Sequence, residues 1–248
     1  MKKNLYLIVG SMAAVFVLGW GCGRAPESGS GKRQIAVVPK GTAHEFWQTV
    51  HAGAKTAGQE LGVEILWQGP QTETQYERQV NIVQDFITAQ VDGIVLAPQD
   101  ADALVPVIEQ VDAAGIPLVL FDSGANTDKY ASFVATDNYK GGQEAARTMA
   151  SLLPNGGRVI IILVAPGSAS TTEREKGFED TITQEFPNIQ IVDKQYGYSD
   201  REKSRAVTED LLTKYPDVEG VYGPNESSTF GALLALRAQG YAGKKAFV

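Results

Sequence analysis

Cysteine, histidine and basic residues are scarce in this chain of 248 residues. It contains one cysteine and two histidines, which are too few for a disulfide framework or for a zinc site built from four Cys and His ligands. Lysine and arginine total 22 against 29 aspartates and glutamates, the formal net charge is -7, and no block of basic residues occurs. We therefore exclude nucleic acid as a partner, because binding it requires a basic surface.

Nucleotide-binding and catalytic motifs are also lacking. No G-x-G-x-x-G follows a predicted strand, and neither a G-x-x-x-x-G-K-[ST] phosphate loop nor a G-x-S-x-G nucleophile motif occurs. The two histidines, His44 and His51, flank the start of one predicted helix and supply too few ligands for a metal site. We therefore expect no metal, no cofactor and no enzymatic activity.

The N-terminal segment is typical of an export signal. Two lysines precede an uncharged run over residues 5–21, and the single cysteine, Cys22, follows this run directly. The run is shorter than the roughly 20 residues of a membrane-spanning helix and suits the core of a signal peptide. Because it resembles a bacterial lipoprotein signal, we expect removal of residues 1–21, lipidation of Cys22 and a flexible tether over residues 22–33. A plain N-terminal membrane anchor is the alternative.

From residue 34 onward, short apolar runs alternate with longer stretches of helical period. The run of β-branched and leucine residues at 159–164 is typical of a strand covered on both faces of a parallel sheet. This alternation predicts a doubly wound α/β protein. The predicted strands are Ile35–Pro39, Val63–Trp67, Gly93–Ala97, Leu118–Phe121, Ser132–Ala135, Arg158–Val164, Ile189–Asp193, Gly220–Tyr222 and Lys245–Val248.

Apolar residues at three- and four-residue steps predict helices between these strands, each with one buried stripe. Glycines at positions 62, 115 and 240 follow helical patterns, where a left-handed cap ends a helix. The stripe on the first helix is Trp47, Val50, Ala54, Ala57 and Leu61, and that on the second is Val80, Val83 and Ile87.

An internal sequence similarity indicates two similar lobes. Residues 91–98, VDGIVLAP, and residues 218–225, VEGVYGPN, each begin a strand, helix and strand unit. We expect a first lobe over residues 34–136 and a second over residues 137–248. Because the sequence stops inside the last predicted strand, we expect the second lobe to be incomplete; a natural edge strand that ends the chain is the alternative.

Polar and aromatic residues gather directly after the predicted strands. Ligands of open α/β sheets bind outside the carboxyl ends of the strands. Aromatic faces cover the C–H face of a sugar, and charged and amide groups bond its hydroxyls. The candidate ligand-binding residues are therefore Lys40, His44, Phe46, Trp47, Asp122, Ser123, Thr136, Arg174 and Asn225.

Five of the candidates also have a purely structural interpretation. Phe46 or Trp47 could pack in the core, Asp122 could cap a turn and Arg174 could be a solvated helix charge. Asn225 could serve only as the N-cap of the helix that follows it. Their shared location at strand ends favours the ligand-binding interpretation.

Six segments in fixed order carry a family resemblance that extends over residues 35–248: IAVVPKGTAHEFW, VDGIVLAPQDADAL, AGIPLVLFDS, VATDNYKGG, GSASTTEREKGF and GVYGPNESSTFGALLALRAQG. The sequence resembles the periplasmic sugar-binding proteins of ABC importers, of the ribose-binding type. The resemblance implies two Rossmann-like lobes joined by three crossing segments, with the ligand held between them by hinge closure. In it, Phe46 and Trp47 match the aromatic pair at the sugar ring, Asp122 the acidic residue, and Arg174 and Asn225 the second-lobe contacts.

Four departures from the family pattern bear on specificity. His44 stands where ribose binders often carry an amide, Ser123 where they carry an arginine, and Ala97 where an amide occurs. The usual stacking aromatic is not aligned near residues 198–199, so the ligand implied is a sugar or sugar-like polyol. The family pattern continues beyond Val248 with Gly-Phe-Asp and a return to the first lobe. A fragment would lack this aspartate and two of the three crossing segments, so we expect it to bind poorly or not at all.

The function implied is that of a solute-binding protein of an ABC importer, held by a lipid anchor at Cys22 in the periplasm or at the cell surface. Its implied partners are a sugar and the ABC permease of the inner membrane, and we expect a monomer. The alternatives are a sugar-sensing lipoprotein that feeds a chemotaxis or signalling receptor, and a secreted carbohydrate-active enzyme.

Overall fold

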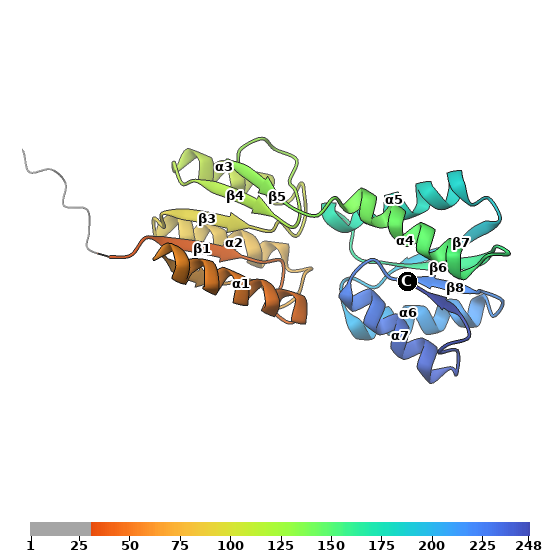
Figure 1. The fold of residues 1–248 in the computed structure, drawn as a ribbon. Coiled ribbons are helices and arrows are strands. Elements are labelled where there is room, and N and C mark those ends of the chain that lie inside the picture. The colour runs from red at the N-terminus through yellow and green to blue at the C-terminus, as the bar shows by residue number, and fades with distance from the viewer. Residues whose placement is uncertain (1–30) are drawn as a thin grey trace, which may run out of the picture. The chain divides into compact units, whose positions relative to one another are not determined.

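The computed structural model describes residues 31–248, of which residues 32–248 form one compact unit. Strands and helices alternate through most of this part of the chain (Figure 1). The elements are β1 (Gln34–Val38), α1 (Glu45–Leu61), β2 (Glu64–Trp67), α2 (Tyr76–Thr88), β3 (Gly93–Leu96), α3 (Val105–Ala113), β4 (Leu118–Phe121), β5 (Ser132–Val134), α4 (Asn138–Leu152), β6 (Gly157–Leu163), α5 (Ala169–Glu185), β7 (Ile189–Tyr196), α6 (Arg201–Lys214), β8 (Gly220–Tyr222), α7 (Glu226–Ala238) and β9 (Ala246–Phe247).

All nine predicted strands are confirmed, with ends that differ by at most three residues. The predicted signal peptide, the lipidated Cys22 and the tether up to residue 30 lie outside the described residues. Among residues 31–248, no helix is both long enough and apolar enough to cross a bilayer.

The strands form two parallel sheets. The first sheet has the order β2-β1-β3-β4-β5, and the second has the order β7-β6-β8-β9. Every strand pair is parallel, and a helix connects each pair of consecutive strands except β4 and β5. The predicted α/β class with two parallel-sheet lobes is therefore confirmed. The lobe boundaries at residues 136 and 137, and the incompleteness of the second lobe, stay predictions.

The second sheet is covered on both of its faces. Along β6, Val159 and Ile161 pack into one apolar cluster, whereas Ile160 and Ile162 pack into another on the opposite face. The first cluster includes residues of α4 and α5, and the second includes residues of α6 and α7. Side chains alternate between the faces of a strand, so a continuous apolar run is what two covered faces demand.

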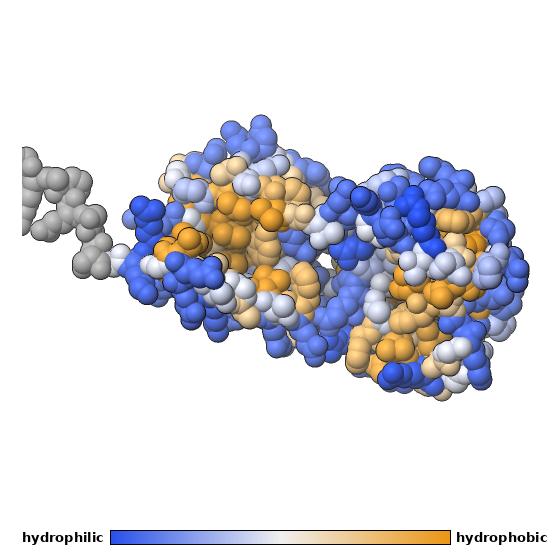
Figure 2. Space-filling view, in the orientation of Figure 1, coloured by the Kyte–Doolittle hydropathy of each residue, from blue (hydrophilic) through white to orange (hydrophobic). Residues whose placement is uncertain are grey.

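The first sheet buries one face along β1, β3 and β4, and the other face only in part. Residues of α2 and α3 pack on β1, β3 and β4 to form its core. On the opposite face lies an apolar hollow beside α1, and Figure 2 shows hydrophobic side chains gathered there. Its lining includes Val37, Val50, Ala54, Leu61, Val119 and Val134.

The predicted buried stripe of α1 is wrong for its C-terminal half. Trp47 is only 2% exposed, but Leu61 is 75% exposed and Ala57 is also exposed. Helical period identifies residues that share one face, whereas burial also needs an element that covers that face. In the described residues, nothing packs over the end of α1.

Glycines set two features that position the site. Gly62, Gly115 and Gly240 follow their helices with φ between 67° and 71°, which confirms the predicted left-handed caps. A Cβ atom on Gly142 of α4 would lie 2.0 Å from the carbonyl oxygen of Arg174 on α5. The absence of a side chain at Gly142 therefore lets the two helices touch, and this contact fixes where α5 presents Arg174.

Candidate ligand-binding site

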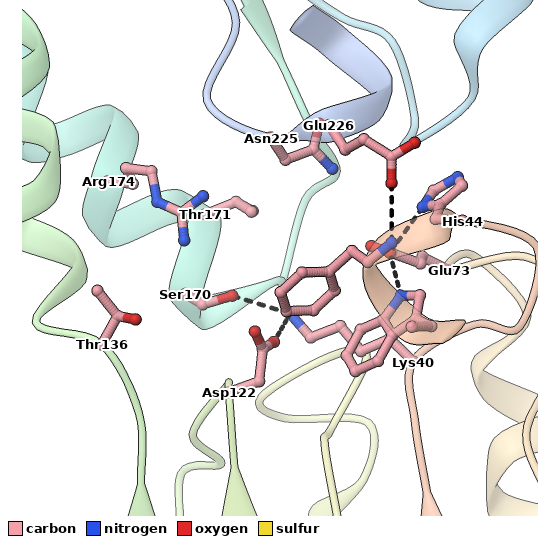
Figure 3. Close-up of a pocket in the computed structure, with 12 residues that line it drawn as sticks. Lys40, His44, Glu73, Asp122, Thr136, Ser170, Thr171, Arg174, Asn225 and Glu226 are labelled. Carbon is pink, nitrogen blue, oxygen red and sulfur yellow. Dashed lines mark hydrogen bonds and ion pairs between the residues drawn. The ribbon is translucent and has the colours of Figure 1, made fainter. Parts of the chain in front are cut away.

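A pocket with a volume of about 140 Å³ lies at the carboxyl ends of strands from both sheets. Lys40 follows β1, Asp122 follows β4 and Thr136 follows β5, while the start of α1, the loop between β2 and α2, α5 and the start of α7 supply the rest of the lining (Figure 3). The lining residues are Lys40, His44, Phe46, Trp47, Glu73, Asp122, Thr136, Ser170, Thr171, Arg174, Asn225 and Glu226.

Eight of the nine candidate residues line this pocket, and Ser123 is the exception. Ser123 is fully buried beneath the wall, where its hydroxyl accepts a hydrogen bond of 3.1 Å from the backbone N–H of Ser170. It therefore supports the start of α5. That the other eight contact a sugar stays a prediction.

Lys40 and Asp122 form an ion pair at the base of the pocket. Lys40 Nζ lies 3.3 Å from Asp122 Oδ2 and also donates to the hydroxyls of Ser168 at 3.0 Å and Ser170 at 2.9 Å. Asp122 has a φ of 61°, a left-handed conformation that Asp tolerates better than most residues and that is enriched at functional sites. The pair therefore joins the edge of the first sheet to the start of α5.

Arg174 and Asn225 occupy the wall formed by the second sheet. Arg174 donates from Nη2 to Asn138 Oδ1 at 2.6 Å and from Nη1 to the carbonyl of Pro224. Both acceptors are neutral, so the guanidinium keeps its charge and N–H groups for a further partner. These two bonds hold the guanidinium plane against the pocket wall. A solvated helix charge, the alternative interpretation of Arg174, would not be held in this way.

Asn225 is the N-cap of α7, as its structural interpretation predicts, and it also lines the pocket. As the N-cap of α7, its Oδ1 accepts from the backbone N–H of Ser228 at 3.0 Å in a capping box. Its Nδ2 donates to Ser199 Oγ at 3.1 Å on the pocket side. The helix cap therefore also fixes which end of the amide faces the pocket.

The two aromatic candidates differ in exposure. Phe46 is 48% exposed, whereas Trp47 is almost fully buried and meets Phe46 edge to face at 4.9 Å between ring centroids. The Trp47 indole N–H donates to Glu73 Oε1 at 2.7 Å. In this structure, Phe46 offers ring surface to the pocket, and Trp47 forms the wall behind it.

Four further residues line the pocket but are not among the nine candidates: Glu73, Ser170, Thr171 and Glu226. Ser170 and Thr171 follow β6, and Glu226 follows Asn225, so the rule of strand ends covers all three, and only the choice of candidates within those segments left them out. Glu73 lies in the loop between β2 and α2, six residues after the strand ends, where an isolated acidic residue carries no signal.

Glu73 and His44 form the second ion pair of the pocket, with 3.1 Å between Glu73 Oε1 and His44 Nδ1. The hydrogen bond to Glu73 raises the pKa of His44 above its ordinary value, although burial alone would lower it. Burial by itself raises the pKa of the Glu73 carboxyl, but the bonds from His44 and Trp47 and the charge of Lys40 together hold it below its ordinary value. Both directions favour the ionised pair.

Metal binding finds no structural support in residues 31–248, since no three His, Cys, Asp or Glu side chains there are placed to share an ion. The pocket instead offers aromatic surface, hydrogen-bond donors and carboxylate oxygens in a small concave space. This combination is typical of a site for a polar small molecule.

Two parallel-sheet lobes with a polar pocket at their strand ends define the class of α/β ligand-binding proteins. Residues 35–248 match the family model described as periplasmic binding protein domain. The chain belongs to this family, and the predicted family resemblance is confirmed. Members of the family are binding proteins that work outside the cytoplasm.

The similar proteins include sugar-binding proteins of ABC transporters. The D-ribose/D-allose-binding protein of Pseudomonas aeruginosa is 34% identical over 86% of this chain and 69% of its own length. The ribose import binding protein RbsB of Bacillus subtilis is 32% identical over 79% of this chain, which spans 62% of the length of that relative.

Solved structures show the same likeness. A carbohydrate transporter solute-binding protein from Agrobacterium radiobacter, in complex with D-arabinose, has a TM-score of 0.85 and 29% identity over 89% of this chain and 76% of that one. A solute-binding protein from Agrobacterium vitis with bound D-fucose has a TM-score of 0.83 and 35% identity over 86% of this chain and 75% of that one.

Proposed function

We propose that the protein is an extracytoplasmic solute-binding protein of an ABC importer, and that it binds a sugar or sugar-like polyol by closure of its two lobes. The observation that carries the proposal is the pocket itself. It draws aromatic, cationic, anionic and amide groups from the strand ends of both sheets, so a ligand there would contact both lobes at once.

The chemistry of these groups suits a polyhydroxylated ligand. Sugar hydroxyls both donate and accept hydrogen bonds, and bonds to ionised groups are roughly twice as strong as bonds between neutral groups. Asp122 supplies a carboxylate acceptor, and Arg174 and Asn225 supply N–H donors. The exposed ring of Phe46 supplies the flat apolar surface that a sugar ring covers with its C–H bonds.

The pocket is arranged to hold a ligand without transforming it. Its three carboxylates are each paired with a basic side chain: Asp122 with Lys40, Glu73 with His44, and Glu226 with Arg201. An acid and base pair for glycoside cleavage instead requires one carboxyl that stays protonated. We therefore propose binding and release of an unchanged sugar.

Transport also requires a location and a receiving partner. We propose lipidation of Cys22, a monomeric protein tethered to the membrane, and delivery of the sugar to an ABC permease. These features depend on residues 1–33 and on surfaces beyond the pocket, and the sequence signal around Cys22 is their support.

A thermal-shift assay of the full-length mature protein with D-ribose, D-allose, D-arabinose and D-fucose tests the proposal. A ligand that binds only the folded state stabilises it by RT ln(1 + [L]/Kd), so the melting temperature should rise with the concentration of at least one sugar. Chromatography of the sugar after incubation should show no product. An absence of any shift would contradict the sugar proposal, and product formation would contradict binding without chemistry.

Two variants locate the site. Phe46→Ala and Asp122→Asn should each reduce or abolish the shift, and neither removes a buried apolar side chain. Tyr76→Ala is the matched control, because Tyr76 is an aromatic residue of similar exposure that does not line the pocket. Equal shifts for all three variants would show that the sugar binds elsewhere.

A further inference from the structure

Glu73 is a buried acidic residue in a surface loop, and the proposed sugar contacts give it no task. Its side chain is only 10% exposed. A carboxylate taken out of water is costly unless hydrogen bonds or an opposite charge compensate for the lost hydration. The groups that compensate Glu73 therefore show what holds it there.

Three donors surround the carboxylate. Oε1 accepts from His44 Nδ1 at 3.1 Å and from Trp47 Nε1 at 2.7 Å, and Oε2 accepts from Ser199 Oγ at 2.9 Å. A carboxylate has about four acceptor sites, so the protein itself fills most of them. Glu73 is thus placed to orient its neighbours, two of which are candidate sugar contacts.

Ser199 approaches from the other wall of the pocket, after β7. It is buried, its φ is 52°, and Tyr198 before it has a φ of 54°. Two consecutive non-glycine residues in this region are unfavourable by about 1–3 kcal/mol each and persist only where the surroundings fix them. Ser199 Oγ also accepts from Asn225 Nδ2 at 3.1 Å, so a chain of hydrogen bonds runs from Asn225 through Ser199 to Glu73.

Charges around the pair act on both of its members. Glu226 raises the pKa of His44 and Arg201 lowers it, whereas Lys40 lowers the pKa of Glu73 and so favours its ionised form. With Nδ1–H committed to Glu73, the protonation of His44 decides whether its other nitrogen, Nε2, donates or accepts a hydrogen bond. No group within residues 31–248 is hydrogen-bonded to Nε2.

We propose that Glu73 is a positioning residue of the pocket: its carboxylate holds Trp47 and His44 on one wall and fastens Ser199 of the opposite wall to them. The inference rests on the proposed function, since it assigns Glu73 a part in presenting the sugar-binding residues. It goes further in two respects. It makes His44 a hydrogen-bond donor toward the ligand, and it makes Glu73, which does not itself contact the ligand, a link between the two walls that close on it.

Histidine NMR titration of Glu73→Gln tests the proposal without any ligand. The amide keeps the size of the side chain but removes its charge, so the titration midpoint of His44 should fall below that of the unmodified protein. His51, the other histidine, stacks on Trp67 away from the pocket and should titrate as before. Glu77→Gln, an exposed residue of α2, is the matched control and should leave both midpoints unchanged. An unchanged His44 midpoint in Glu73→Gln would overturn the proposal.

A second measurement needs no variant. The indole N–H resonance of Trp47 should follow the titration of His44, because both share Glu73 Oε1, whereas that of Trp67 should follow His51. If the Trp47 resonance ignores the His44 midpoint, the shared carboxylate is refuted, even where Glu73→Gln fails to fold.

Sugar affinity separates the two proposals. For a sugar that binds the unmodified protein, with D-ribose as the first probe, Glu73→Gln should raise the Kd by about tenfold, the equivalent of about 1.4 kcal/mol. An unchanged Kd would overturn the positioning role. If no sugar binds the unmodified protein while the His44 midpoint still falls, the proposed function fails and the hydrogen-bonding role of Glu73 is supported.

Discussion

Replacement of Lys40 by methionine should destabilise the protein by about 2–3 kcal/mol. Methionine keeps much of the length of the side chain, so the main loss is the charge 3.3 Å from Asp122 and the two hydrogen bonds to serines. At an effective dielectric constant of about 20, two unit charges at this distance attract by roughly 332/(20 × 3.3), or about 5 kcal/mol. The dehydration of the lysine offsets part of this attraction.

The exposure of Lys40 and Asp122 determines how much unfolding free energy the Lys40→Met variant loses. The Lys40 side chain is 3% exposed, but that of Asp122 is 21% exposed, so water can rehydrate the abandoned carboxylate. We therefore expect less than the roughly 3–5 kcal/mol lost when one member of a fully buried pair is removed.

Urea unfolding followed by circular dichroism measures this loss in a double-mutant cycle. The cycle compares Lys40→Met, Asp122→Asn and the double variant, and we expect a coupling energy of about 1–2 kcal/mol between the two sites. Lys55→Met, at an exposed position of α1, is the control and should change the unfolding free energy by less than about 0.5 kcal/mol. A loss for Lys40→Met as small as that of the control, or strictly additive losses in the cycle, would refute the reasoning.

Two further predictions concern burial. Leu61→Ala should change the unfolding free energy by less than about 0.5 kcal/mol, because Leu61 is mostly exposed. Ile82→Ala, at a fully buried position, should lower it by about 2–5 kcal/mol. Similar losses for the two variants in urea unfolding would show that the end of α1 is covered. Burial raises the pKa of Glu175 to about 7, so the folded state holds a proton that the unfolded state releases, and stability should fall as the pH rises from about 4 to 7. Glu175→Gln retains an acceptor for the Val164 N–H and should flatten this fall between pH 5 and pH 7; an equally steep fall in the variant would assign it to other groups.

The strands and most pocket residues could be predicted because both follow from local pattern. A parallel strand buried on both faces needs a continuous apolar run, and the residue that follows it emerges at the edge of the sheet. This logic located Asp122 after β4, Thr136 after β5 and Asn225 after β8, all of which line the pocket.

The failures arise where tertiary packing decides. The stripe of α1 predicted that Leu61 shares a face with Trp47, but period alone could not reveal that nothing described here covers its end. Ser123 follows β4 as Asp122 does, yet it is buried below the pocket wall, where its hydroxyl accepts a hydrogen bond from the backbone N–H of Ser170 at the start of α5. Glu73 has no local pattern at all, since its three donors come from the N-cap and first turn of α1 and from the loop after β7.

The N-cap of α7 makes one part of the pocket preorganised. Because Asn225 Oδ1 is held by Ser227 and Ser228, the orientation of the amide is settled by the helix before any ligand arrives. A ligand atom bonded at Nδ2 therefore avoids the roughly 0.5–1.5 kcal/mol of rotamer entropy that immobilising a free side chain costs. That ligand atom must also be a hydrogen-bond acceptor, because Nδ2 can only donate. The start of α7 therefore determines both the entropic cost of this ligand contact and the kind of ligand atom that can make it.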